Sequence, residues 1–167
     1  VINLLIPALL LRYTLNNEAL QAWQNVISAP LIGFLTIAAG YAVAGAASRL
    51  MRGSSAEERR SFTFTVGMHN YGYFAIPIVM LLYAEPARTL ALGALFLYMT
   101  GVEVAKWTVG VITLTGSWDK RALRRVVNPP LLALLLALLL NGIGLSAHLP
   151  DWLLKTVDYL GRCAIPL

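Results

Sequence analysis

Apolar runs long enough to cross a bilayer alternate with short polar stretches along this 167-residue chain. A membrane-spanning helix needs about 20 largely apolar residues. The runs Val26–Ser48 and Thr89–Thr115 reach this length, whereas Val1–Leu11 is short and is expected to be the end of a span. Val26–Ser48 is also rich in glycine and alanine, which let helices approach closely in lipid. The pattern predicts an all-α integral membrane protein.

Two further segments combine apolar runs with residues that interrupt or start helices. Ser61–Tyr83 holds polar residues, a glycine and a proline at its centre, so a broken span is expected there. A leucine-rich span that reaches about Leu145 opens with Asn-Pro-Pro. Asn128 is its expected N-cap, because an asparagine side chain accepts a hydrogen bond from a free amide of the first helical turn. Pro129 is its expected first helical residue, because proline has no amide hydrogen that would need a partner there.

The last part of the chain, Leu149–Leu160, is amphipathic, and a final span is expected to begin near Tyr159. The chain starts at Val1 inside one apolar run and stops at Leu167 as another begins. We therefore expect an internal fragment of a larger membrane protein, in which a signal peptide is not expected.

The composition supports a membrane protein and argues against a soluble domain. Hydrophobic residues make up 58% of the chain, charged residues 13%, and the mean hydropathy is +0.69. Soluble domains are about 45–50% apolar and about 25% charged. The net charge of +5 does not indicate nucleic-acid binding, because most cations lie in two loops between apolar runs. A single cysteine excludes an internal disulfide.

The two basic loops, Arg49–Arg60 and Gly116–Arg125, are separated by two expected spans and should lie on the same side of the membrane. Loops rich in lysine and arginine are typically cytoplasmic. The linkers at 12–25, 84–88 and 144–150 hold few cations and should lie opposite. A multi-pass protein of the plasma or inner membrane is expected, with both basic loops in the cytoplasm.

The polar centre of the broken span is the predicted substrate site. Lipid cannot satisfy the backbone groups that a broken helix frees, so such breaks are covered by protein or line a water-filled cavity. Asn70 offers a donor and an acceptor without a charge and is the first candidate for substrate binding. An alternative role is to cap a helix end. His69 and Tyr71 flank it and are further candidates. His69 is either a carrier of a coupling proton or a neutral histidine bonded to a backbone carbonyl, and Tyr71 either lines the cavity or packs between helices.

Glycine and proline are expected to shape the helix breaks. Gly72 tolerates backbone angles that other residues avoid, and Pro77 lacks an amide donor. Pro7 lies within the first apolar run and is expected to act in the same way.

Glu103 and Lys106 are three residues apart within an expected span, so they share a helix face. Ionised groups at that depth are costly unless they are paired or hydrated. They are interpreted as a self-neutralising structural pair, with ion or proton coupling as the alternative. No metal site and no cofactor is expected, and coupling to H⁺ or Na⁺ stays open.

Several motifs resemble the auxin efflux carrier family of secondary transporters, within the bile acid, auxin and arsenite transporter superfamily. The central match is Asn70-Tyr71-Gly72-Tyr73-Phe74-Ala75-Ile76-Pro77, which resembles the family's Asn-x-Gly-x-x-Gly-x-Pro pattern with Ala75 in place of the second glycine. The other matches are Leu5-Ile6-Pro7-Ala8-Leu9-Leu10, Val127-Asn128-Pro129-Pro130 and Gly161-Arg162-Cys163-Ala164-Ile165-Pro166-Leu167.

The resemblance implies an inverted-repeat fold of five plus five spans, of which this chain covers roughly spans two to seven. It assigns 26–115 to the mobile transport unit, 116–128 to a cytoplasmic basic loop, and 1–11 and 129–167 to a static scaffold through which a homodimer is expected. The second crossover helix would lie outside this chain.

The resemblance also implies function: a permease or efflux carrier that moves a small organic anion, or a related metabolite, by alternating access. A non-transporting membrane sensor or subunit of the same fold is the first alternative. An intramembrane enzyme is the second, and it is poorly supported because the metal-binding His-Glu-x-x-His and nucleophilic Gly-x-Ser-x-Gly motifs are missing.

Overall fold

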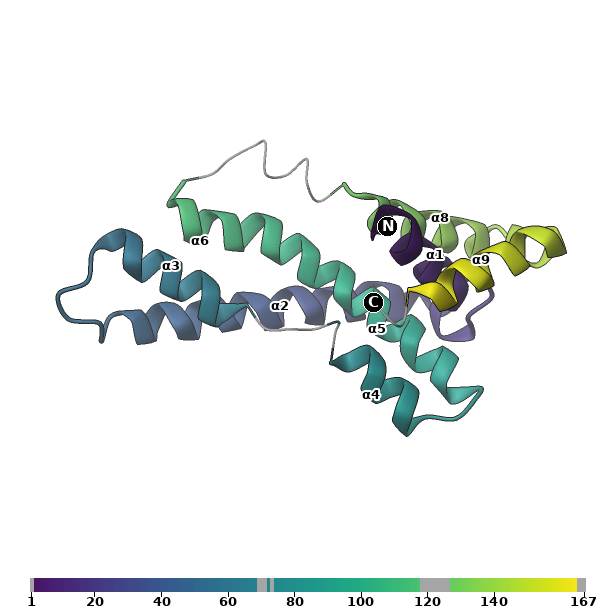
Figure 1. The fold of residues 1–167 in the computed structure, drawn as a ribbon, viewed down its shortest axis with the longest axis horizontal. Coiled ribbons are helices and arrows are strands. Elements are labelled where there is room, and N and C mark those ends of the chain that lie inside the picture. The colour runs from purple at the N-terminus through teal and green to yellow at the C-terminus, as the bar shows by residue number, and fades with distance from the viewer. Residues whose placement is uncertain (1, 69–71, 73, 118–126, 165–167) are drawn as a thin grey trace. The chain divides into compact units, whose positions relative to one another are not determined.

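A computed structural model describes residues 2–68, 72, 74–117 and 127–164, and all regular secondary structure among them is helical (Figure 1). The α-helices are α1 (Ile2–Thr14), α2 (Trp23–Ser48), α3 (Ala56–Gly67), α4 (Ala75–Leu82), α5 (Ala87–Ala105), α6 (Val111–Thr115), α8 (Pro129–Gly142) and α9 (Asp151–Cys163). The 3₁₀ turns are η1 (Glu18–Leu20) and η3 (Leu145–His148), and η2 (Lys106–Gly110) is a π-helical turn.

Among the described residues, two helices are long and apolar enough to cross a membrane. One is α2, with 26 residues, and the other runs through α5, η2 and α6 for 29 residues from Ala87 to Thr115. Both predicted long helices are therefore confirmed as helices of spanning length. In α8, Asn128 caps the helix as predicted by accepting a hydrogen bond from the amide of Leu131 at 2.9 Å.

Two predicted spans near the end of the chain differ from the structure. Helix α8 has 14 residues and ends at Gly142 rather than Leu145, because Gly144 adopts a left-handed φ of 72° that a helix cannot continue through. Its length of about 21 Å is less than the hydrocarbon core of about 30 Å. Helix α9 runs through Tyr159 to Cys163 without a separate helix beginning there, and the continuation of the predicted last span lies outside the described residues.

Helix α3 begins inside the stretch predicted to be a basic loop. Ser55 is its N-cap and accepts a hydrogen bond from the amide of Glu58 at 3.2 Å, and the Glu58 carboxylate accepts one from the Ser55 amide at 2.7 Å. This reciprocal pair is a capping box, which satisfies two amides that the first helical turn leaves free. Residues 56–60 are therefore helical, and only 49–55 form the loop.

The chain divides into two compact units, each described by itself. Unit 1 comprises Val1–Ser28, Ala75–Leu97 and Val127–Leu167, and unit 2 comprises Ala29–Phe74 and Tyr98–Val126. The segments near the two ends of the chain share unit 1. Residues 75–97 belong to unit 1 as well, whereas the resemblance groups them with the segments of unit 2.

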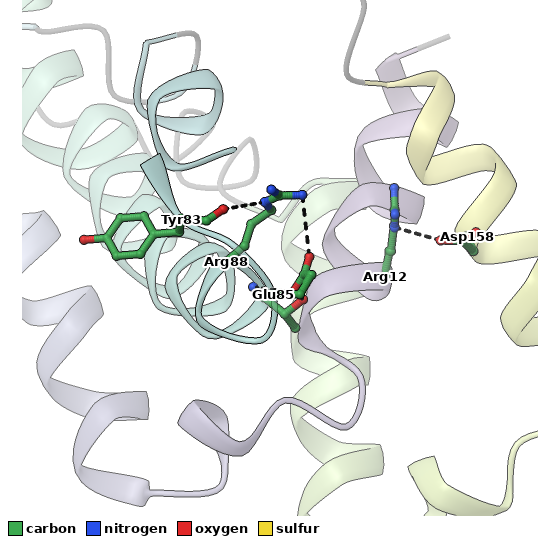
Figure 2. A network of polar contacts seen from close by, with 6 residues as sticks. Arg12, Tyr83, Glu85, Arg88 and Asp158 are labelled. Carbon is green, nitrogen blue, oxygen red and sulfur yellow. Dashed lines mark hydrogen bonds and ion pairs between the residues drawn. The ribbon is translucent and has the colours of Figure 1, made fainter. Parts of the chain in front are cut away.

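In unit 1, helix α1 packs against both α8 and α9. Arg12 of α1 forms an ion pair with Asp158 of α9 at 2.8 Å (Figure 2), and Arg162 holds the other oxygen of that carboxylate at 2.9 Å. Figure 2 also shows Arg88 in the first turn of α5, where it donates to the carbonyl of Tyr83 at 2.8 Å and approaches Glu85. Ion pairs and hydrogen bonds of charged side chains therefore stabilise the helix ends of this unit.

The side-chain amides of Asn17 and Asn141 donate hydrogen bonds to carbonyls at the carboxyl end of α1. Asn141 of α8 donates to the Thr14 carbonyl at 2.7 Å and accepts from the Asn16 amide at 3.0 Å. Asn17 is 1% exposed and donates to the carbonyls of Tyr13 and Thr89 at 2.8 and 2.7 Å. The last carbonyls of a helix have no partner within it, so these side chains supply the missing donors.

In unit 2, glycines bring helices into backbone contact. A Cβ atom added at Gly33 of α2 would lie 2.1 Å from the carbonyl oxygen of Tyr98 in α5. One added at Gly101 of α5 would lie 1.7 Å from the carbonyl oxygen of Pro30. Any side chain would force these helices apart. The predicted role of small residues in close packing is therefore confirmed.

Two arginines of α3 hold the carboxyl ends of α2 and α6 at one end of unit 2. Arg59 donates to the carbonyl of Met51, just beyond α2, at 3.0 Å. Arg60 donates to the carbonyl of Thr115, the last residue of α6, at 3.4 Å. Cations are favoured at the carboxyl ends of helices. Helices α2 and α6 thus end beside the start of α3, and the predicted membrane side of the two loops stays a prediction.

The glycine contacts predict a sharp difference between two alanine substitutions in the same helix. Gly33→Ala should destabilise the protein by about 1–3 kcal/mol, because overpacking displaces backbone. Gly45→Ala is the matched control, since its Cβ atom would lie at an ordinary 3.6 Å from Thr63. Chemical unfolding in detergent measures both. Equal midpoints for the two variants would contradict the close contact.

The capping box predicts a pH-dependent start of α3. Hydrogen bonds from the backbone and then the side chain of Ser55 hold the pKa of Glu58 below its usual range. The carboxylate therefore stabilises the helix above its unfolded pKa, and this stability is lost as pH falls through the lower, folded pKa. Amide exchange in the first turn of α3, corrected for intrinsic rates, should accelerate in that window. Ser55→Ala should weaken this dependence, and an unchanged profile would contradict the proposal.

Candidate functional site

The helix interruption predicted at the candidate substrate site is present. Helix α3 ends at Gly67, and α4 begins at Ala75. Between them Met68 is extended, with φ −90° and ψ 116°, and Gly72 and Phe74 are not helical. The predicted binding residues His69, Asn70 and Tyr71 lie outside the described residues.

Helix α2 holds the carboxyl end of α3. A Cβ atom at Gly40 would lie 2.6 Å from the carbonyl oxygen of Gly67, and one at Gly67 would lie 2.4 Å from the ring of Tyr41. The Tyr41 ring also stacks on Phe64 of α3, with ring centroids 6.1 Å apart. The point at which α3 stops is therefore fixed by direct packing on a candidate membrane span.

The three residues predicted to shape helix breaks lie in different local settings. Gly72 lies in the interruption, and its φ is outside the left-handed region. Pro77 is the third residue of α4, where a first-turn amide has no helical acceptor and its loss costs little. Pro7 lies inside α1, which continues from Ile2 to Thr14. The prediction that Pro7 breaks its helix is wrong, because α1 tolerates one missing backbone hydrogen bond.

Glu103 and Lys106 form the pair that their spacing predicts. The Lys106 ammonium contacts one carboxylate oxygen of Glu103 at 2.5 Å, and the indole N–H of Trp107 donates to the other at 3.1 Å. The ammonium also lies 5.4 Å from the centre of the Trp107 ring. A carboxylate with two donors beside a paired cation lowers the cost of placing charge inside a spanning helix.

A π-helical turn begins at Lys106, and no sequence signal predicted it. The Thr108 hydroxyl donates to the Val104 carbonyl at 2.6 Å within this turn. At its end, a Cβ atom on Gly110 would lie 2.5 Å from the Tyr41 hydroxyl oxygen. Single π turns within helices often occur at functional sites.

Tyr41 links the π turn to the carboxyl end of α3 and was not among the predicted site residues. Its side chain is 4% exposed, and its hydroxyl has no hydrogen-bond partner among the described residues. A buried hydroxyl can both donate and accept, so it is a polar group next to the interruption. A tyrosine within a run of small residues gives no sequence signal for such a position.

The described residues hold no group of three or more metal-ligating side chains. No protein-family model, curated protein or solved structure matches the chain. The resemblance to the auxin efflux carriers thus depends on the sequence motifs, and the function drawn from it is a proposal.

The geometry of the Glu103–Lys106 pair predicts strong coupling between the two residues. Glu103→Gln and Lys106→Gln should each destabilise the protein by leaving one charge without its counter-ion. The double variant should recover stability, with a coupling energy of about 0.5–3 kcal/mol in detergent unfolding. Strictly additive effects would contradict a structural pair. Loss of the pH dependence of uptake in Glu103→Gln, at unchanged stability, would indicate the coupling role instead.

Proposed function

We propose that this chain is part of a secondary transporter of the auxin efflux carrier type, which moves a small organic anion across the cytoplasmic membrane by alternating access. The observation that carries the proposal is the interruption between Gly67 and Ala75, which lies in sequence between two helices of spanning length. Interrupted helices of this kind form the substrate sites of many secondary transporters.

The chemistry of the interruption favours an anion. The first amides of α4 have no helical acceptor and carry a partial positive charge. Asn70 lies five residues before Ala75 and adds an uncharged donor and acceptor. Dicarboxylates, amino acids and aromatic acids each present a carboxylate to such donors. The proposal therefore specifies a small organic anion with a carboxylate and not one of these three classes.

The membrane placement is proposed on the same basis. The full protein would hold ten spans in two inverted repeats. The end of unit 2 at which α2 and α6 terminate would face the cytoplasm, because Arg49, Arg52, Arg59 and Arg60 gather before and at the start of α3.

The test is counterflow of labelled substrate in proteoliposomes that contain the full-length protein carrying this sequence. L-Malate, L-glutamate and indole-3-acetate are the probes, one for each class of acid. The wild-type protein should exchange at least one of them. Asn70→Ala should slow that exchange about tenfold or more, because a hydrogen bond to a charged group contributes about 1.5–3 kcal/mol.

Asn3→Ala is the matched control, since it removes the same amide from an exposed position in α1. Binding without exchange would indicate a sensor, and chemical alteration of a probe would indicate an enzyme. Either result, or undiminished exchange by Asn70→Ala, would overturn the proposal.

A further inference from the structure

Helix α9 has one face covered by unit 1 and another that is exposed. Helix α1 packs against it (Figure 1), and a Cβ atom at Gly161 would lie 3.1 Å from the Arg12 side chain. The buried and half-buried apolar residues recur at helical spacing and form the covered face. They are Leu153, Leu154, Val157, Leu160, Gly161 and Ala164.

The exposed face carries alternating aromatic and basic residues. Trp152, Lys155, Tyr159 and Arg162 are spaced by three, four and three positions, which places them in one stripe along the helix. Trp152 and Tyr159 are each 68% exposed. Tryptophan and tyrosine favour the headgroup region of a bilayer, and lysine and arginine are attracted to anionic lipids.

Asp158 neutralises only part of the positive charge, because its one carboxylate is shared by two guanidinium groups, and Lys155 adds a further positive charge. Asp158 is held between Arg12 and Arg162, and Arg12 belongs to α1. Asp151 lies in the first turn, where a carboxylate offsets the positive end of the helix dipole. The stripe is therefore basic and matches an anionic surface.

The spacing of the stripe also determines how α9 lies. Lys155 and Arg162 are seven residues apart, which is about 10 Å along the helix axis. In an upright helix one of them, and one of the two aromatic residues, would lie about 10 Å deeper in the bilayer. Charge at that depth is costly. In a helix parallel to the membrane surface, all four side chains reach the headgroups at one depth.

We propose that α9 is an interfacial helix whose Trp152, Lys155, Tyr159 and Arg162 stripe contacts anionic phospholipid headgroups. The contact requires a membrane-embedded chain but not the transport function. It replaces the sequence prediction that this region begins a span.

The orientation is tested by spin labels in the full-length protein, reconstituted in phosphatidylcholine vesicles with phosphatidylglycerol. One label is placed on Cys163 and another on Thr156→Cys in a background without other cysteines. Both positions are exposed and about 10 Å apart along the axis. Power saturation with oxygen and a nickel chelate should give depths that agree within about 3 Å for a helix that lies flat.

The lipid preference is tested by the association of spin-labelled phosphatidylglycerol and phosphatidylcholine with the same protein. Lys155→Gln should reduce the preference for phosphatidylglycerol about fivefold, since each basic residue near the surface contributes about one kcal/mol. Lys155→Arg keeps the charge and should retain the preference.

Three results would overturn the proposal. They are a depth difference of about 10 Å between the two labels, equal association of the two lipids, or an unchanged preference in Lys155→Gln. Efficient cross-linking of Cys163 between two copies, with lipid excluded from the stripe, would show that a second chain covers this face instead.

Discussion

A peptide group that loses its helical partner within a bilayer finds no water to bond to, and under the proposed membrane placement this constraint accounts for several local features of the chain. At the end of α1, the amides of Asn17 and Asn141 supply donors. In the π turn, the Thr108 hydroxyl donates to a carbonyl of the preceding turn. At the end of α3, the Met68 amide still donates to the Phe64 carbonyl at 3.2 Å. At each of these three places a hydrogen-bond donor is present.

The second constraint is that lipid provides little hydrophobic driving force for helix association, so close packing must provide it. In unit 2 this packing centres on α2. Gly33 admits the backbone of α5, and Gly40 admits the last residue of α3. The buried cluster around Ile37, Tyr41, Val102 and Ala105 fills the space between these contacts. The same helix therefore supports both the second candidate span and the end of the interrupted helix.

Local patterns in the sequence predicted the features that depend on local physics. Long apolar runs predicted α2 and the helix that contains α5, the Asn-Pro-Pro motif predicted the start of α8, and a polar stretch with glycine and proline predicted the interruption. The Ser55–Glu58 capping box was also readable, as a serine followed three residues later by glutamate. The proline in α1 was misjudged, because one missing hydrogen bond does not end a helix that is packed on two others.

Features that depend on distant residues could not be predicted in this way. The amide of Asn141 closes a helix that lies 127 positions earlier in the chain. Tyr41 is notable only because Gly67 and Gly110 bring two other segments against its ring and hydroxyl. No characteristic residue pattern in the sequence identifies the π turn. Tertiary packing decides all three, and a single sequence does not record it.

The charged groups divide into two kinds, and this division relates the structure to the membrane. Glu103 and Lys106 lie within a candidate span and neutralise each other on the same helix. Arg12, Asp158 and Arg162 join two helices of unit 1, with the carboxylate shared by both guanidinium groups. Lys155 stands on the exposed stripe of α9 beside aromatic residues. Unpaired charge is tolerated only where water or lipid headgroups reach it. The pairing of Glu103 with Lys106 is therefore compatible with a place inside a membrane, and the exposed Lys155 fits the proposed surface position of α9.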